Sequence, residues 1–165
     1  MSYQEKRTIT SIITGALVLA AYCIEAFGLY QSGMVAQGDL KLWAITMLKY
    51  IGIGIVAAIV IQIVFHIMLS ISIAVKETIR DNQVAEEEIG KKIEGEMVED
   101  ERDKLIGLKS NMAGFILAGI GFVWGLISLA LNSSPVIMLN IMFISFSAGS
   151  LVEGFAQLYF YRKGV

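Results

Sequence analysis

Two carboxylates, those of Glu25 and Glu153, stand within long apolar stretches of this 165-residue sequence. An ionised side chain at the centre of a bilayer costs at least about 2.5–3.5 kcal/mol, so such a group needs a partner, a proton or a wet cavity. The candidate partners of Glu153 are Gln62, His66 and Gln157. These side chains could line a polar path for a proton or a cation. Alternatively, Glu153 is a protonated acid that is hydrogen-bonded inside a helical bundle, and Glu153→Gln would then change neither stability nor activity.

Glu25 is predicted to form an ion pair with Lys49. Glu25 lies about five residues from the end of one apolar stretch, and Lys49 lies about six residues inside the next. At about 1.5 Å of helix per residue, the two depths agree within a few ångström. We interpret the pair as a lock on packing and register, with a role in an ion path as the alternative.

No catalytic, cofactor or metal site is indicated. The sequence lacks G-x-S-x-G, H-E-x-x-H, C-x-x-C, Walker and dinucleotide-binding motifs. The single His66 and the single Cys23 are far apart in the chain and suggest no dyad. The acidic run from Glu94 to Asp103 lacks EF-hand spacing, so a solvated helix of mixed charge explains it better than a Mg²⁺ or Ca²⁺ site. We therefore expect no enzyme and no cofactor.

The elements that carry these residues follow from composition. Hydrophobic residues make up 56% of the chain and charged residues 17%, with a net charge of −2, whereas soluble domains carry roughly 25% charged residues. This balance excludes a disordered chain and a nucleic-acid-binding arm. Crossing about 30 Å of hydrocarbon takes about 20 apolar residues of helix, and four stretches qualify: 8–30, 43–75, 105–131 and 136–161.

The prediction is an all-α fold, a single membrane domain over 1–165, built as a four-helix transmembrane bundle of two hairpins. Backbone groups in lipid must be paired within their own segment, which requires helices. The second stretch is longer than a span needs, so it must tilt or continue past the membrane. Asn132, Ser133 and Ser134 predict a turn and a helix cap, with Pro135 in the first turn of the fourth helix.

A stripe of small residues marks one face of the third stretch. Its members are Gly114, Ala118, Gly121 and Gly125, at spacings of four, three and four. Small residues let helix backbones approach closely in lipid. The stripe predicts helix packing inside the bundle, with contact between two copies of the chain as the alternative.

Orientation follows from Lys and Arg, which are enriched on cytoplasmic flanks. They precede the first stretch, follow the fourth, and lie between the second and third, so both termini and the segment 76–104 are predicted to be cytoplasmic. That segment holds eleven acidic and six basic residues, a net charge of −5. Ile89, Ile93 and Met97 recur at helical spacing, so it should be a charged helical segment with one apolar side.

The run from Val98 to Lys109 contains Asp-Glu-Arg-Asp followed by Leu-Ile-x-Leu-Lys and leads into a Gly-rich stretch. It resembles a family of uncharacterised small bacterial four-helix integral membrane proteins, which share a DERDxLIxLK element before the third span. The resemblance implies a bacterial cytoplasmic membrane. It supplies no activity, substrate or site.

These observations predict a non-enzymatic accessory or regulatory membrane subunit. The alternative is a small transporter or channel subunit with a polar intramembrane path around Glu153. The partners expected are the lipid bilayer, a second copy or another membrane protein, and a cytoplasmic protein on 76–104, but no nucleic acid. A cavity that reaches Glu153 would favour transport, and a dry bundle would favour the accessory role.

Overall fold

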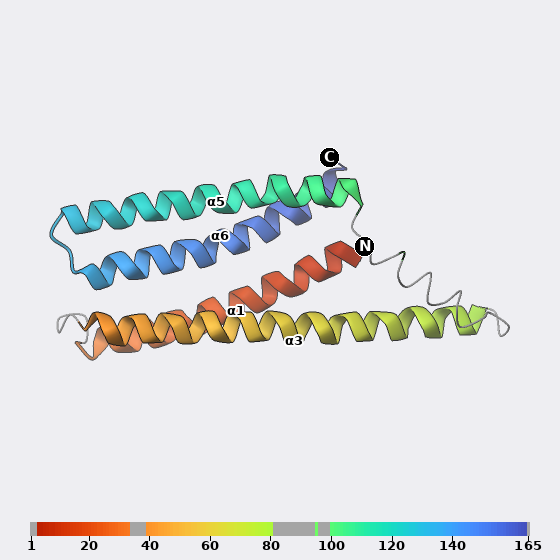
Figure 1. Ribbon diagram of the computed structural model, residues 1–165, viewed down its shortest axis with the longest axis horizontal. Coiled ribbons are helices and arrows are strands. Elements are labelled where there is room, and N and C mark those ends of the chain that lie inside the picture. Colours follow the sequence, from red (N-terminus) through yellow and green to blue (C-terminus); the bar gives the residue numbers. More distant parts are fainter. Residues whose placement is uncertain (1–2, 34–38, 81–94, 96–99, 165) are drawn as a thin grey trace.

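The computed structural model describes residues 3–33, 39–80, 95 and 100–164, and these residues form long helices and no strand (Figure 1). The helices are α1 (Tyr3–Gln31), α3 (Leu40–Arg80), α5 (Glu101–Ala130) and α6 (Pro135–Lys163). Each contains a stretch that is long and apolar enough to cross a membrane. The predictions of an all-α fold and of four candidate spans are therefore confirmed.

α5 and α6 begin before the predicted stretches, at positions where polar residues cap them. Asp100 caps α5: its carboxylate accepts from the Asp103 backbone N–H at 2.6 Å, and the Asp103 carboxylate accepts from the Asp100 N–H at 3.2 Å. The first and last residues of the Asp-Glu-Arg-Asp element therefore form a capping box. At α6, Ser134 is the cap and Pro135 lies in the first turn, as predicted. Asn132 supplies the turn with a φ of 62°, a conformation that Asn tolerates better than most residues.

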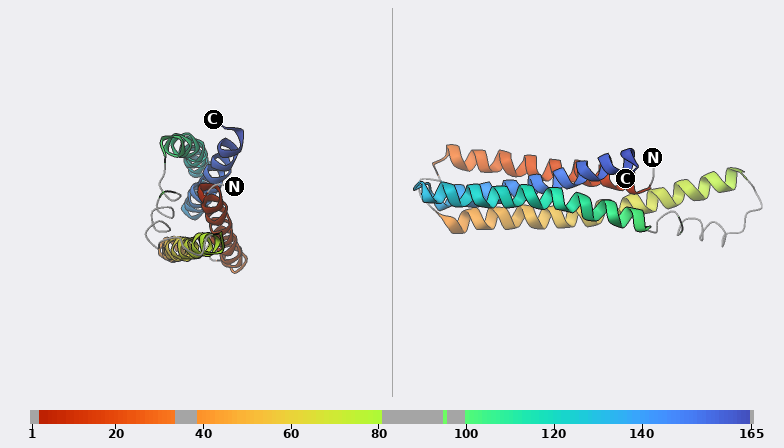
Figure 2. Two further views of the ribbon diagram at one scale, coloured as in Figure 1. Left: turned by 90° about the vertical axis from the view of Figure 1, so that its right-hand side faces the viewer. Right: turned by 90° about the horizontal axis from the view of Figure 1, so that it is seen from above.

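Both termini lie at one end of the bundle, which we call the termini end; the turn between α5 and α6 lies at the other, the turn end (Figure 1). At the termini end, the Arg102 guanidinium of α5 donates to the Tyr161 carbonyl of α6 at 3.5 Å. α3 continues past the other helices at this end (Figures 1 and 2). Its 41 residues measure about 60 Å, roughly twice the hydrocarbon thickness. The candidate span within it ends at Ser72.

The helices pack unequally. α5 and α6 share the most extensive contact, α1 packs on both α6 and α3, and α3 contacts α6 only locally. Among the described residues, α3 and α5 share at most isolated contacts. Seen along the bundle, α3 stands apart from the α5–α6 pair (Figure 2).

The small-residue stripe forms the seam between α5 and α6. All four of its members are buried. A Cβ atom on Gly114 would lie 2.7 Å from the Gly149 carbonyl oxygen, and one on Gly121 would overlap Ser145. At Gly125, the neighbours are methionine side chains of α6. The stripe therefore faces α6 of the same chain.

A buried core joins three helices at the turn end. Tyr22 of α1, Trp43 and Met47 of α3 and Val136 of α6 form it. The Tyr22 hydroxyl donates to the Asn140 side-chain oxygen at 2.7 Å. α1, α3 and α6 are thus held together at the turn end, and the cavities described next open between them toward the termini end.

Candidate functional site: an amphipathic groove

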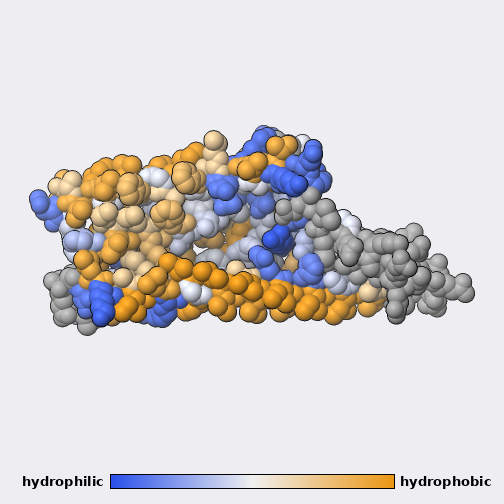
Figure 3. Space-filling model, viewed as in Figure 1, coloured by the Kyte–Doolittle hydropathy of each residue, from blue (hydrophilic) through white to orange (hydrophobic). Residues whose placement is uncertain are grey.

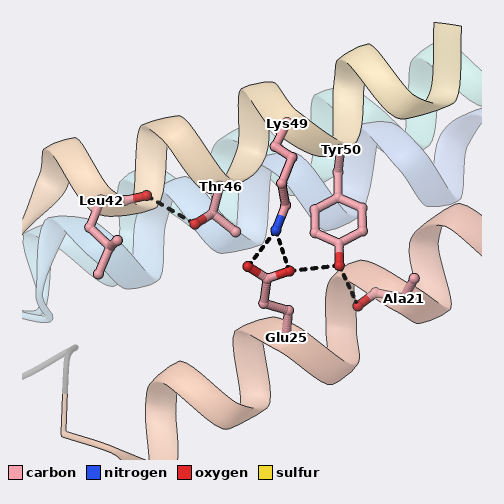
Figure 4. Close-up of polar contacts among 6 residues, drawn as sticks. All are labelled: Ala21, Glu25, Leu42, Thr46, Lys49 and Tyr50. Carbon is pink, nitrogen blue, oxygen red and sulfur yellow. Dashed lines mark hydrogen bonds and ion pairs between the residues drawn. The ribbon is translucent and has the colours of Figure 1, made fainter. Parts of the chain in front are cut away.

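The structure brings Glu25 and Lys49 together between α1 and α3 (Figure 4). The Lys49 ammonium lies 2.5 Å from Glu25 Oε2 and 2.6 Å from Oε1. Tyr50, which the sequence reasoning did not include, places its hydroxyl 2.8 Å from Glu25 Oε2 and 3.1 Å from the Ala21 carbonyl oxygen. The Glu25 carboxylate thus has a neutralising cation and a second hydrogen-bond donor. Both come from α3, so the arrangement joins α1 to α3 and does not indicate a ligand site.

Glu153 is placed differently. It lies on α6, partly buried, and lines a cavity of about 340 Å³ between α1, α3 and α6. Within the described part of the chain, its carboxylate forms no hydrogen bond and no ion pair. We call this cavity the polar pocket; its polar lining residues are Gln4, Arg7, Thr8, Ser11, Gln62, Ser150, Glu153 and Gln157.

Hydrogen bonds fix part of the polar pocket. The Thr8 hydroxyl lies 3.0 Å from Gln157 Oε1 and 2.9 Å from the Gln4 carbonyl oxygen, and links α1 to α6. Gln4 is only 7% exposed, and within the part of the chain that the structure describes its side-chain Nε2 has no hydrogen-bond partner. A buried donor left unpaired costs about 1–3 kcal/mol. Among the described residues, a carboxylate that lines the pocket and a buried amide donor beside it thus both lack a partner.

Two of the three predicted partners of Glu153 line the same pocket. Gln157 and Gln62 do so, whereas His66 lies in a neighbouring cavity of about 440 Å³. There its Nδ1 atom is 3.2 Å from the Tyr3 hydroxyl. His66 is thus occupied with the start of α1 and is not grouped with Glu153.

An apolar cavity of about 640 Å³ adjoins the polar pocket. The two share Ser11, Gly15, Gln62 and Ser150. Beyond these shared residues, most lining side chains of the larger cavity are apolar, among them Leu19, Ile55 and Phe146. We call the two cavities together the amphipathic groove. Figure 3 shows the surface hollowed between α3 and the helices opposite it, with hydrophilic residues near the termini end.

The groove presents groups that can bind a ligand through hydrogen bonds and charge beside an apolar wall. Its lining offers one carboxylate, one guanidinium, three amides and hydroxyl groups beside an apolar wall. Among the described residues, no group of His, Cys, Asp and Glu side chains is arranged to hold a metal ion. Most of the acidic segment, residues 81–94 and 96–99, lies outside the described residues, and so does its predicted apolar side at Ile89, Ile93 and Met97.

The α1 wall of the pocket was missed by the sequence reasoning, although a signal exists. Gln4, Thr8, Ser11 and Gly15 follow one another at spacings of four, three and four. That spacing keeps small and polar residues on one face of a helix. The same rule identified the stripe on α5.

No family model, curated protein or solved structure matches the chain.

Proposed function

We propose that the chain is a non-enzymatic integral membrane protein whose working site is the amphipathic groove, in a small transporter or ligand-binding subunit. One observation carries the proposal: the Glu153 carboxylate lines a cavity but has no partner among the described residues. An intramembrane carboxylate needs compensation. The Glu25 carboxylate is compensated within the chain by Lys49, so the contrast between the two acids supports a ligand, a proton or water at Glu153.

The same geometry argues against an open pore. Polar side chains gather around Glu153, but the adjoining cavity has mainly apolar walls. At the turn end, the buried core of Tyr22, Trp43 and Val136 closes the space between α1, α3 and α6. An ion would lose its hydration along that route without replacement. The groove suits a molecule that is held from one side of the membrane.

Cysteine accessibility tests the proposal. In a Cys23→Ala background, Ser150→Cys places a thiol in the groove, whereas Val152→Cys places one on the outer face of α6, where it lines neither cavity. We expect a charged, membrane-impermeant thiosulfonate reagent to modify residue 150 at least about tenfold faster than residue 152. The reaction requires a hydrated thiolate, and lipid excludes both water and charge.

The comparison uses protein stripped of bound lipid, because a lipid in the groove would shield residue 150. Equal and negligible modification at both positions of that protein would contradict the proposal. The groove would then be dry, as the accessory interpretation requires. Far-ultraviolet circular dichroism of both variants controls for loss of helix.

The second candidate is an accessory or regulatory subunit that docks a cytoplasmic protein on residues 76–104. One observation favours it: α3 continues as a helix to Arg80, beyond the end of its candidate span at Ser72. Both candidates share the proposed setting, a bacterial cytoplasmic membrane crossed by two hairpins with the termini inside. Both also allow a second copy or another membrane protein as partner.

A further inference from the structure

The amphipathic groove is polarised along the membrane normal. The polar pocket is lined by residues 4–15 of α1, which begins at the termini end. The apolar cavity is lined by residues 11–19 of the same helix and therefore lies deeper. Polarity thus falls from the surface toward the bilayer centre, as it does along a phospholipid. The volumes, about 340 and 640 Å³, fall in the range of ligand sites.

The charges that line the polar pocket are balanced. Arg7 is the one cation and Glu153 the one anion in the described lining. A phosphate suits the guanidinium, whose N–H groups match its oxygens. An ammonium suits the Glu153 carboxylate. A headgroup that carries both charges offers a cation to Glu153 and an anion to the further N–H donors of Arg7, whereas a purely anionic headgroup offers Glu153 no cation.

The described lining also distinguishes between ammonium groups. Quaternary ammonium ions are recognised by cages of aromatic rings. None of the described residues that line the polar pocket is aromatic. A primary ammonium has three N–H donors for a carboxylate and for amide oxygens such as that of Gln62. The chemistry therefore favours a primary over a quaternary amine.

We propose that the amphipathic groove binds a phospholipid of the surrounding bilayer that has a primary ammonium headgroup, with its ammonium at Glu153, its phosphate at Arg7 and an acyl chain in the apolar cavity. This inference rests on the proposed function and names its ligand. The lipid enters from the side, where α3 and α5 barely touch in the described part of the chain.

Native mass spectrometry of the delipidated full chain in detergent tests the inference. The probes are phosphatidylethanolamine, phosphatidylcholine and phosphatidylglycerol with identical acyl chains. We expect the ethanolamine lipid to bind about tenfold more tightly than either of the others, since one charge-assisted hydrogen bond is worth about 1.5–3 kcal/mol. Equal affinity for the three lipids would overturn the inference, and this result needs no variant.

Variants of Glu153 and Arg7 test which residue binds the ammonium of the headgroup and which binds its phosphate. Glu153→Gln should weaken phosphatidylethanolamine binding about tenfold and leave phosphatidylcholine unchanged, and Glu153→Asp should restore the selectivity. Arg7→Gln should weaken both lipids, because both contain the phosphate. The matched control is Glu101→Gln, which removes an exposed carboxylate at the same end of the bundle and should change neither affinity.

The two proposals can fail separately. If Ser150→Cys is accessible to the charged reagent but the three lipids bind alike, the groove is a working site for another ligand and the lipid inference is wrong. If Ser150→Cys is inaccessible and no lipid is retained, both proposals are wrong. Selectivity that persists in Glu153→Gln would place the ammonium elsewhere and overturn the assignment.

Discussion

At the scale of single residues, two acids that stand in similarly apolar stretches of the sequence have different partners in the structure. Glu25 is held by Lys49 and Tyr50 on the neighbouring helix, whereas Glu153 has no partner within the described residues and lines a cavity. A carboxylate that is neutralised inside the fold contributes to assembly. A carboxylate that lines a cavity without a partner in the fold limits which molecules can occupy that cavity. Local sequence does not separate the two cases, but the partners do.

The first prediction concerns the ion pair. Lys49→Met should lower the free energy of unfolding by about 1–3 kcal/mol, because it leaves the Glu25 carboxylate without its cation. Denaturant titration in detergent micelles measures this change.

The double variant Glu25→Gln/Lys49→Met is the control for that experiment. It removes both charges together, so it should recover most of the lost stability. If Lys49→Met alone is as stable as the parent, the pair does not lock α1 to α3.

At the scale of elements, the helices differ in how closely their backbones approach. The α5–α6 seam allows backbone contact because Gly114 faces Gly149. α3 carries larger aliphatic side chains that remain exposed along much of its length, among them Ile55, Ile59 and Ile63. In lipid, helices associate through close packing and interhelical hydrogen bonds. α5 and α6 therefore form a tightly packed unit, with α1 on one side and α3 loosely attached.

The seam gives a matched pair of variants on α5. Gly114→Ala should destabilise the protein by about 1–3 kcal/mol, because the new Cβ would lie 2.7 Å from the Gly149 carbonyl oxygen and the helices must separate. Gly119→Ala adds a methyl group where nothing lies within 4 Å and should be neutral or stabilising by up to about 1 kcal/mol.

Thermal unfolding monitored by circular dichroism compares the two variants. Equal changes in Tm for Gly114→Ala and Gly119→Ala would show that the α5–α6 contact is looser than described.

At the scale of the whole molecule, the fold was more predictable than the site. Hydropathy and length identify the four helices because lipid demands long apolar segments with paired backbones. The depth of a residue along its helix can also be predicted from the sequence, because each residue adds a fixed rise, and this was enough to predict the contact between Glu25 and Lys49. The rotation of each helix about its own axis is harder to predict, because apolar residues cover most sides of these helices and do not show which side faces the neighbouring helices. Hence His66, predicted beside Glu153, lies instead against Tyr3, and the Gln4–Thr8 wall was missed.

Topology across the membrane is a prediction for the whole chain. In the Cys23→Ala background, Ser133→Cys, in the α5–α6 turn, should react with an impermeant maleimide added to intact cells. Lys163→Cys, at the termini end, should react only after the membrane is opened. The positive-inside rule supplies the reason, since Arg162 and Lys163 follow α6. Reaction of Lys163→Cys in intact cells would reverse the proposed orientation.

The way in which α3 is attached to the other helices affects how it can move. It is buried against other helices mainly near Trp43 and Met47, and its remaining length of about 50 Å is attached only loosely. Thinner bilayers make long helices lean further. If α3 tilts while its segment near Trp43 and Met47 stays fixed, the distance from the rest of α3 to α1 and α6 changes. The same chain would then have a narrower or a wider groove in bilayers of different thickness.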